Sequence, residues 1–187
     1  VIASKVSGIS QPSFVVLARQ FQSFSFYDNF INIANRQLLN PISTGSTEKY
    51  FFLIQDTLYT DRNDTVFIIS FRPRQGKNFD GMQGVLYINS HGYAVQNVLA
   101  EAFNQENEFM KVSIQQQYDL IDGERWFPVQ LNSSITVDRN PMGGGRMGPL
   151  KLTGTGKSYI ANINFHPQFA ADEFSDVKLE VDPGAHK

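Results

Sequence analysis

The segment from Phe109 to Val137 constrains the fold most, because one turn sorts its side chains into two faces. Asp122-Gly123 predicts a two-residue hairpin turn, since a type I′ turn needs positive φ at both central residues. Pairing Ile121 with Glu124 puts an apolar set on one face: Met110, Val112, Ile114, Tyr118, Leu120, Phe127, Val129, Leu131 and Ile135. It puts a polar set on the other face: Lys111, Ser113, Gln115, Gln117, Asp119, Gln130, Asn132, Ser134 and Thr136. A one-residue slip would bury the polar set, so the pattern predicts a long antiparallel hairpin with one dry and one wet face.

Composition is typical of one folded domain over residues 1–187. Charged residues make up 18% of the chain and aromatic residues 13%, with 16 phenylalanines, which is not a disordered composition. The net charge of -2 does not indicate nucleic-acid binding. The absence of cysteine excludes disulfides, thiol catalysis and cysteine-ligated zinc. No apolar run is long enough for a membrane helix. Because the chain begins at Val1, we expect it to be excised from a longer protein.

One early segment is predicted to be a helix that ends near Leu39. Asp28 is a suitable N-cap, Phe30, Ile33 and Leu38 recur at helical spacing, and Asn40-Pro41 terminates the run. A second, short helix is predicted over residues 169–174.

The remaining apolar runs predict strands joined by short turns. They are Ser13–Phe26, Lys49–Thr60, Thr65–Pro73, Gly84–Asn89, Tyr93–Phe103, Pro149–Phe165 and Asp176–Val181, in addition to the opening hairpin. The expected fold is mainly β (α+β), a curved, largely antiparallel sheet or half-barrel of about eight or nine strands with one or two helices.

Gly154-Thr155-Gly156-Lys157-Ser158 resembles the end of a phosphate-binding loop. The motif also needs a glycine where this chain has Lys151, and it must open a helix. Both flanks are strand-like, so a glycine bulge inside a strand is the preferred interpretation, and no nucleotide is expected at Lys157 and Ser158.

No other set of residues indicates a cofactor, a metal or a catalytic centre. His91, His166 and His186 lack partners at ligand spacing, and surface or turn positions explain them. The acidic run around Asp61 lacks the glycine and distal glutamate of a calcium loop, and turn chemistry explains it. We therefore expect no catalytic, cofactor or metal residues and no enzymatic activity.

Three hypotheses of function remain, and they differ in what covers the dry face. The first is a binding module that holds a lipid, an acyl chain or an apolar peptide on a concave sheet face. Its candidate ligand-binding residues are Val112, Ile114, Tyr118, Phe127, Val129 and Leu131. The second is a structural or protein-interaction domain with a self-filled core, and the third, an enzyme, lacks a visible catalytic set. A cavity of several hundred Å³ would favour the first hypothesis and a continuously packed core the second.

Several runs together resemble the middle region of a family of Bacteroidetes outer-membrane proteins of unassigned function. The runs are Ala3–Gly8, Tyr27–Asn29, Asn40–Ser43, Phe71–Pro73, Phe79–Ile88, Tyr93–Val98 and Asp122–Pro128. In that family a carboxypeptidase-regulatory-like domain precedes this region and a β-barrel follows it. The resemblance implies a periplasmic or outer-membrane-associated location in the cell envelope, with the adjoining domains as partners. It implies no catalytic residues. The strand order is also similar to that of periplasmic lipoprotein carriers, whose concave apolar face holds acyl chains, but this analogy concerns the fold alone.

Overall fold

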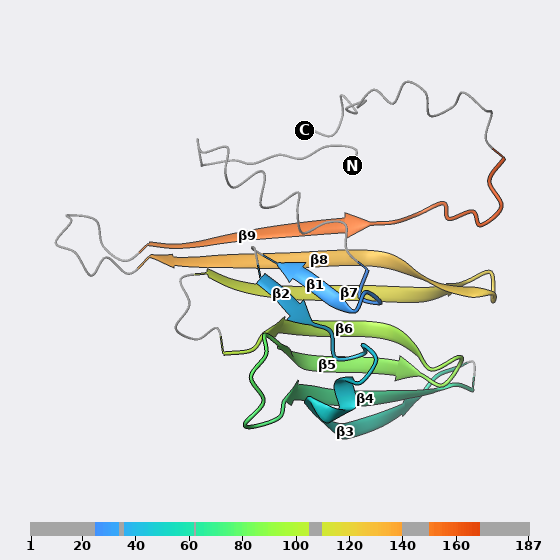
Figure 1. Ribbon diagram of the computed structural model, residues 1–187. Helices are drawn as coiled ribbons and strands as arrows, with labels where there is room; N and C mark the ends of the chain where they lie inside the picture. The colour runs from blue at the N-terminus through green and yellow to red at the C-terminus, as the bar shows by residue number, and fades with distance from the viewer. Residues whose placement is uncertain (1–24, 34–35, 62, 105–109, 140–149, 169–187) are drawn as a thin grey trace, which may run out of the picture.

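The computed structural model describes residues 25–33, 36–61, 63–104, 110–139 and 150–168. Over these residues the chain forms nine strands in two sheets, and seven of the strands make one antiparallel sheet in the order β3-β4-β5-β6-β7-β8-β9 (Figure 1). Its strands are β3 (Tyr50–Tyr59), β4 (Thr65–Pro73), β5 (Met82–Asn89), β6 (Ala94–Ala102), β7 (Met110–Ile121), β8 (Arg125–Arg139) and β9 (Leu150–Tyr159). Each strand pairs with the next in the chain, so the sheet is an open meander. The predicted mainly-β antiparallel fold is confirmed in these terms.

The segment predicted as a helix over residues 28–39 is a β-hairpin, so that prediction was wrong. It consists of β1 (Phe30–Ile33) and β2 (Arg36–Leu39), and the described residues contain no α-helix, only a short 3₁₀ turn, η1 (Ser46–Glu48). Ile31 lies opposite Leu38 in the hairpin register, and both side chains are fully buried. On β1 the burial alternates, since Phe30 and Asn32 are exposed on either side of Ile31, because a strand turns successive side chains to opposite faces.

Asn40 holds the entry and the exit of this hairpin together. Its side-chain Nδ2 donates to the carbonyl oxygen of Phe26 and, at 2.8 Å, to that of Asp28. Its Oδ1 accepts the backbone N–H of Ile42 at 3.0 Å. Asn40 is fully buried, and these bonds satisfy a buried polar group. The sequence suggested only that Asn40-Pro41 stops a helix, and this bridging role depends on tertiary contacts.

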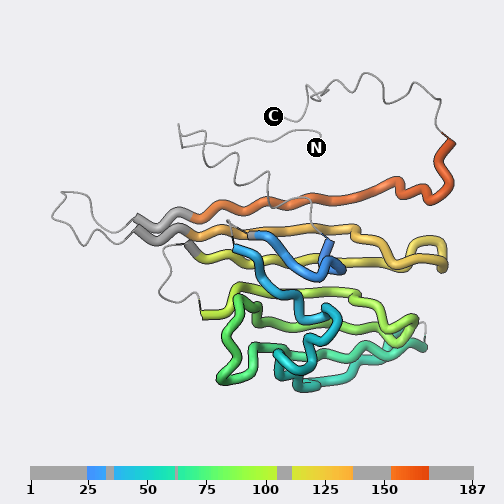
Figure 2. The backbone as a smooth tube through the Cα atoms, in the orientation of Figure 1, coloured from blue at the N-terminus to red at the C-terminus, as the bar shows by residue number. Residues whose placement is uncertain are grey.

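The hairpin β1–β2 lies across one face of the large sheet, as Figure 1 shows, and the chain then runs to the edge strand β3 (Figure 2). Phe26, Ile31 and Leu38 contribute fully buried side chains to the core from this segment. Leu39 of β2 also belongs to the core, and the large sheet supplies the other members: Tyr50, Phe71, Met82, Leu86, Val95, Val98, Ala100, Ala102, Val112, Ile114, Tyr118 and Ile135. The core therefore lies between the hairpin and one face of the sheet.

The β7–β8 turn lies at Asp122-Gly123, with φ of 52° and 73°, as predicted. The pairing differs, because Ile121 lies opposite Arg125 instead of Glu124 and a register shift follows between Gln117 and Tyr118. The turn and the register shift each displace the observed pairing by one residue from the predicted pairing. The total displacement of two residues returns the side chains beyond the shift to the faces that the sequence predicts. Near the turn the faces change, and Phe127 lies opposite Asp119 rather than opposite Tyr118.

Strand β9 contains the glycine-rich run that resembled a phosphate loop. Its register with β8 is continuous from Leu150 to Tyr159, so the predicted bulge at Gly154 and Gly156 was wrong. The run is a regular strand that opens no helix, which removes the helix N-terminus that a phosphate loop needs.

No helix among the described residues is long and apolar enough to cross a membrane. The strand predicted over Asp176–Val181, the helix predicted over 169–174 and residues 13–24 of the first strand lie outside the described residues.

Candidate functional site

Three of the six residues predicted to bind an apolar ligand lie in the protein's own core. Val112, Ile114 and Tyr118 are 4%, 3% and 3% exposed. The Tyr118 hydroxyl accepts the backbone N–H of Phe26 at 3.2 Å and donates to Gln116 Oε1 at 2.7 Å. The Tyr118 ring meets that of Tyr27 edge-on, with centroids 5.5 Å apart. At these positions, the segment that leads into β1 covers the apolar face.

Burial raises the pKa of Tyr118 to about 12, and the hydrogen bond from the Phe26 backbone opposes the rise. The phenol is therefore a structural donor and acceptor at neutral pH. Gln116, fully buried beside it on the same face, was not expected there. Alternation places Gln116 on the same face as Ile114 and Tyr118, but a polar residue type gives no signal for burial, because only tertiary partners stabilise a buried carboxamide.

The other three predicted residues lie apart from this group, and all three are half-buried. The Phe127 ring packs edge-on against that of Phe165, with centroids 5.7 Å apart. Val129 is the extra residue at the register shift of β8, and its carbonyl oxygen accepts the N–H of Ile160 at 2.9 Å. Leu131 lies opposite Gln116, on the core face. The structure therefore does not gather the six residues into one surface.

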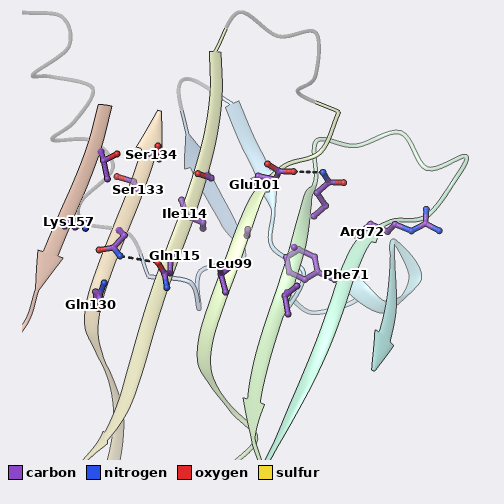
Figure 3. A pocket seen from close by; sticks show the side chains of 17 residues that line it. Phe71, Arg72, Leu99, Glu101, Ile114, Gln115, Gln130, Ser133, Ser134 and Lys157 are labelled. Atoms are coloured by element: carbon purple, nitrogen blue, oxygen red, sulfur yellow. Dashed lines mark hydrogen bonds between the residues drawn. The ribbon is translucent and has the colours of Figure 1, made fainter. Parts of the chain in front are cut away.

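A pocket of about 770 Å³ lies on the opposite, wet face of the sheet (Figure 3). We call it the polar pocket. Its lining comes from six neighbouring strands, β4 to β9. The polar side chains of the lining on this face are Arg72, Gln83, Glu101, Ser113, Gln115, Gln130, Asn132, Ser134, Thr155 and Lys157. Val85 and Leu99 add apolar surface. Gln115, Gln130 and Asn132, which were predicted to face away from the dry side, belong to this pocket.

The sheet register arranges these side chains in three rows, because residues directly opposite each other share a face. The first row is Gln83, Glu101, Ser113, Ser134 and Thr155. The central row is Val85, Leu99, Gln115, Asn132 and Lys157. A third row, Asn97, Gln117, Gln130 and Tyr159, lies beside the central one, and of these four only Gln130 lines the pocket. The polar pocket is thus a grid of side chains set by strand pairing, and Figure 3 shows Gln115, Gln130 and Lys157 on neighbouring strands.

The floor of the polar pocket depends on Gly84. A Cβ atom added there would lie 2.0 Å from the carbonyl oxygen of Leu99 and 2.8 Å from the Cα of Ala100. Strands β5 and β6 approach this closely because residue 84 has no side chain. This contact has no signal in the sequence beyond the presence of a glycine inside a strand.

The charged groups of the polar pocket are partly engaged with neutral neighbours. Glu101 accepts a hydrogen bond from Gln83 Nε2 at 2.6 Å. The Arg72 guanidinium lies over the Phe51 ring, 5.4 Å from its centroid. Lys157 is exposed at the far side, on β9. The lining is therefore mainly neutral and rich in carboxamides and hydroxyls.

Two buried carboxamide oxygens on this face have no hydrogen-bond partner. They are Asn132 Oδ1, in the central row, and Asn97 Oδ1, in the third row. Asn132 Nδ2 donates to Gln115 Oε1 at 3.3 Å, so the amide nitrogen of this side chain has a hydrogen-bond partner and its oxygen has none. A buried acceptor without a donor costs about 1–3 kcal/mol. This part of the sheet therefore has hydrogen-bonding capacity left for a donor.

Among the described residues, which leave out 34–35, 62, 105–109 and 140–149 between the two ends, no three histidine, aspartate or glutamate side chains gather as metal ligands. The polar pocket contains no such group, and its chemistry is hydrogen bonding.

Comparison with known proteins gives a match to a protein family. The model of a family described as a family of unknown function, DUF5686, matches residues 1–144. No curated protein and no solved structure matches the chain.

Proposed function

The chain belongs to the DUF5686 family, and we propose that it is a non-enzymatic binding module that takes a polar ligand in the polar pocket. The observation that carries this proposal is the contrast between the two faces of the sheet. Phe26, Ile31 and Leu38 of the chain itself pack on the dry face, whereas the wet face is hollowed. A volume of about 770 Å³ lies in the range of small-molecule sites.

An apolar ligand on the dry face stays a prediction. Phe127, Val129 and Leu131 are the half-buried members of that predicted site, whereas Val112, Ile114 and Tyr118 are enclosed. The location in the cell envelope and the adjoining domains, which the resemblance implies, also stay predictions.

Mapping of amide shifts on ¹⁵N-labelled protein tests the proposal. The probes are maltohexaose, tetragalacturonate, the peptide Ser-Asn-Ser-Gly and palmitate. We expect at least one polar probe to shift amides around Gln115, Asn132 and Thr155. Replacing Ser134 by tryptophan should fill the pocket and remove the shifts. Thr136→Trp is the matched control, because Thr136 lies two residues further along β8 on the same face and outside the lining.

The proposal fails if none of the three polar probes binds, or if both tryptophan variants bind them as the native protein does. Shifts from palmitate alone, grouped around Val112 and Leu131, would instead support the apolar-ligand hypothesis.

A second function, a structural or protein-interaction domain, is favoured by the edge strand β3. Over the described residues β3 pairs only with β4, so its outer edge has free backbone groups. Five apolar side chains on it are exposed: Phe51 at 38%, Leu53 at 49%, Ile54 at 61%, Leu58 at 47% and Tyr59 at 84%. Exposed apolar edge strands are ready to pair with another strand.

Analytical ultracentrifugation tests this second function at rising protein concentration. If β3 docks strands, self-association or binding of an added apolar strand peptide should be lost in Ile54→Lys. Tyr93→Lys is the control, because Tyr93 is 75% exposed and lies outside β3. A protein that stays monomeric and does not bind the peptide argues against strand docking.

A further inference from the structure

We infer that the ligand of the polar pocket is a neutral, hydroxyl-rich molecule with apolar C–H surface, which is the chemistry of an uncharged oligosaccharide. This inference rests on the proposed function and adds the class of ligand.

The hydrogen-bonding groups of the lining are of a kind that suits hydroxyls. Four are carboxamides, Gln83, Gln115, Gln130 and Asn132, and three are hydroxyls on the same face, Ser113, Ser134 and Thr155. The fourth hydroxyl residue of the lining, Ser133, lies opposite Ile114 on the core face. Each of these groups both donates and accepts hydrogen bonds. A ligand hydroxyl does the same from a single atom, so it can match any position of the grid.

The orphaned oxygen of the lining selects for a ligand that donates. Asn132 Oδ1 accepts hydrogen bonds only and lacks a donor, whereas Asn97 Oδ1, also without a donor, lies outside the lining. A ligand carboxylate or phosphate supplies acceptors and leaves the Asn132 oxygen unpaired. A ligand hydroxyl that reaches Asn132 Oδ1, as the carboxamide turns toward the pocket, pairs a group that is otherwise costly to bury.

The charges of the lining do not suit a polyanion. Two cationic side chains, Arg72 and Lys157, stand against one acidic side chain, Glu101. Arg72 is stacked on Phe51, so its guanidinium already has a contact on one face. Recognition of anionic groups generally uses converging arginines that bind in pairs of hydrogen bonds, and this lining has one arginine.

Apolar surface lies among the polar groups rather than apart from them. In the central row, Leu99 is 41% exposed and lies directly opposite Gln115. Beside the lining, at the end of the third row, Tyr159 is 69% exposed and lies opposite Gln130, which lines the pocket. A sugar ring presents hydroxyls around its rim and C–H groups on its faces, so it can use both kinds of surface at once.

Isothermal titration calorimetry on the full chain tests the class of ligand. The neutral probes are maltohexaose, cellohexaose, mannohexaose and xylohexaose, and the charged probe is hexagalacturonate. We expect at least one neutral probe to bind more tightly than hexagalacturonate. Gln115→Ala should weaken that binding about three- to tenfold, through loss of a neutral hydrogen bond. Gln117→Ala is the matched control, on the same strand and face but outside the lining, and should leave binding unchanged.

A second variant tests neutrality without disturbing the fold. Lys157 is exposed, and Lys157→Gln removes its charge but keeps a hydrogen-bonding group. Binding of a neutral probe should change less than about twofold in this variant. The inference on ligand class is overturned if Lys157→Gln loses most of its affinity for the neutral probe. It is also overturned if the protein binds hexagalacturonate or the peptide Ser-Asn-Ser-Gly but no neutral oligosaccharide. Either result leaves the proposed function standing. If no polar probe binds at all, both are overturned.

Discussion

The hydroxyl of Tyr118 accepts the backbone N–H of Phe26 at 3.2 Å, between residues 92 positions apart in the chain. This bond ties the segment leading into β1 to strand β7, in the middle of the large sheet. Phe26 is fully buried next to it, so the contact closes the dry face with the chain's own residues.

Loss of this tie should destabilise the protein. In Tyr118→Phe the Phe26 N–H loses this buried acceptor, and we expect the free energy of unfolding to fall by about 1–3 kcal/mol. Urea denaturation measures the change. Tyr93→Phe is the control, because Tyr93 is 75% exposed, and it should have almost no effect. Equal stability of the two variants would contradict the structural role of Tyr118.

Alkaline pH should weaken the fold through the two buried phenols. Burial raises the pKa of Tyr50 to about 12, and the hydrogen bond from the Met82 backbone opposes the rise. Burial likewise raises the pKa of Tyr118 to about 12. Each tyrosine therefore has a higher pKa in the folded state than the ordinary value of about 10. The folded state then holds these protons more tightly than the unfolded state, and its stability is complete below pH 10 and falls as pH rises toward 12.

Urea denaturation of the native protein and Tyr50→Phe at pH 8 and pH 11 measures this effect. The drop in stability should be smaller in the variant, which has one phenol fewer to ionise. An equal drop in both proteins would show that Tyr50 does not contribute to the alkaline loss.

The hairpin β1–β2 should behave as core. Leu38 is fully buried, and Leu38→Ala should cost about 2–5 kcal/mol because the neighbouring side chains cannot collapse completely. Leu58→Ala is the matched control at an edge position that is 47% exposed, and it should cost far less. If urea titration finds the two variants equally stable, the hairpin does not cover the sheet as described.

Gly84→Ala should be destabilising for steric reasons. The new Cβ atom would lie 2.0 Å from the Leu99 carbonyl oxygen, and strands β5 and β6 would have to separate. We expect a loss of about 3 kcal/mol or more, at the upper end for an overpacked core position. Gly45→Ala separates this cause from backbone strain, since its Cβ meets nothing within 4 Å but φ is +77°. It should lose only about 1–2 kcal/mol, and a loss as large as that of Gly84→Ala would refute the steric account.

The strands and the two faces of β7–β8 were predictable from local patterns. Thr65–Pro73 matches the observed β4 at both ends, and positive φ at Asp122 and Gly123 follows from turn chemistry. The faces hold away from the turn because alternation reports burial on each strand separately. The exact pairing near the turn was not predicted. A register shift alters which residues of two strands lie opposite each other, but it leaves the alternation of apolar and polar residues along each single strand unchanged.

The sequence by itself determined an antiparallel β domain with one apolar and one polar face, because a period of two residues is a local property of the chain. Only the tertiary structure decided what covers the apolar face. Phe30, Ile33 and Leu38 fit helical spacing, yet Ile31 and Leu38 pair in a hairpin because a flat sheet face and the buried Asn40 favour it. The polar pocket was likewise decided in three dimensions, since its rows join residues from five strands that only pairing brings together.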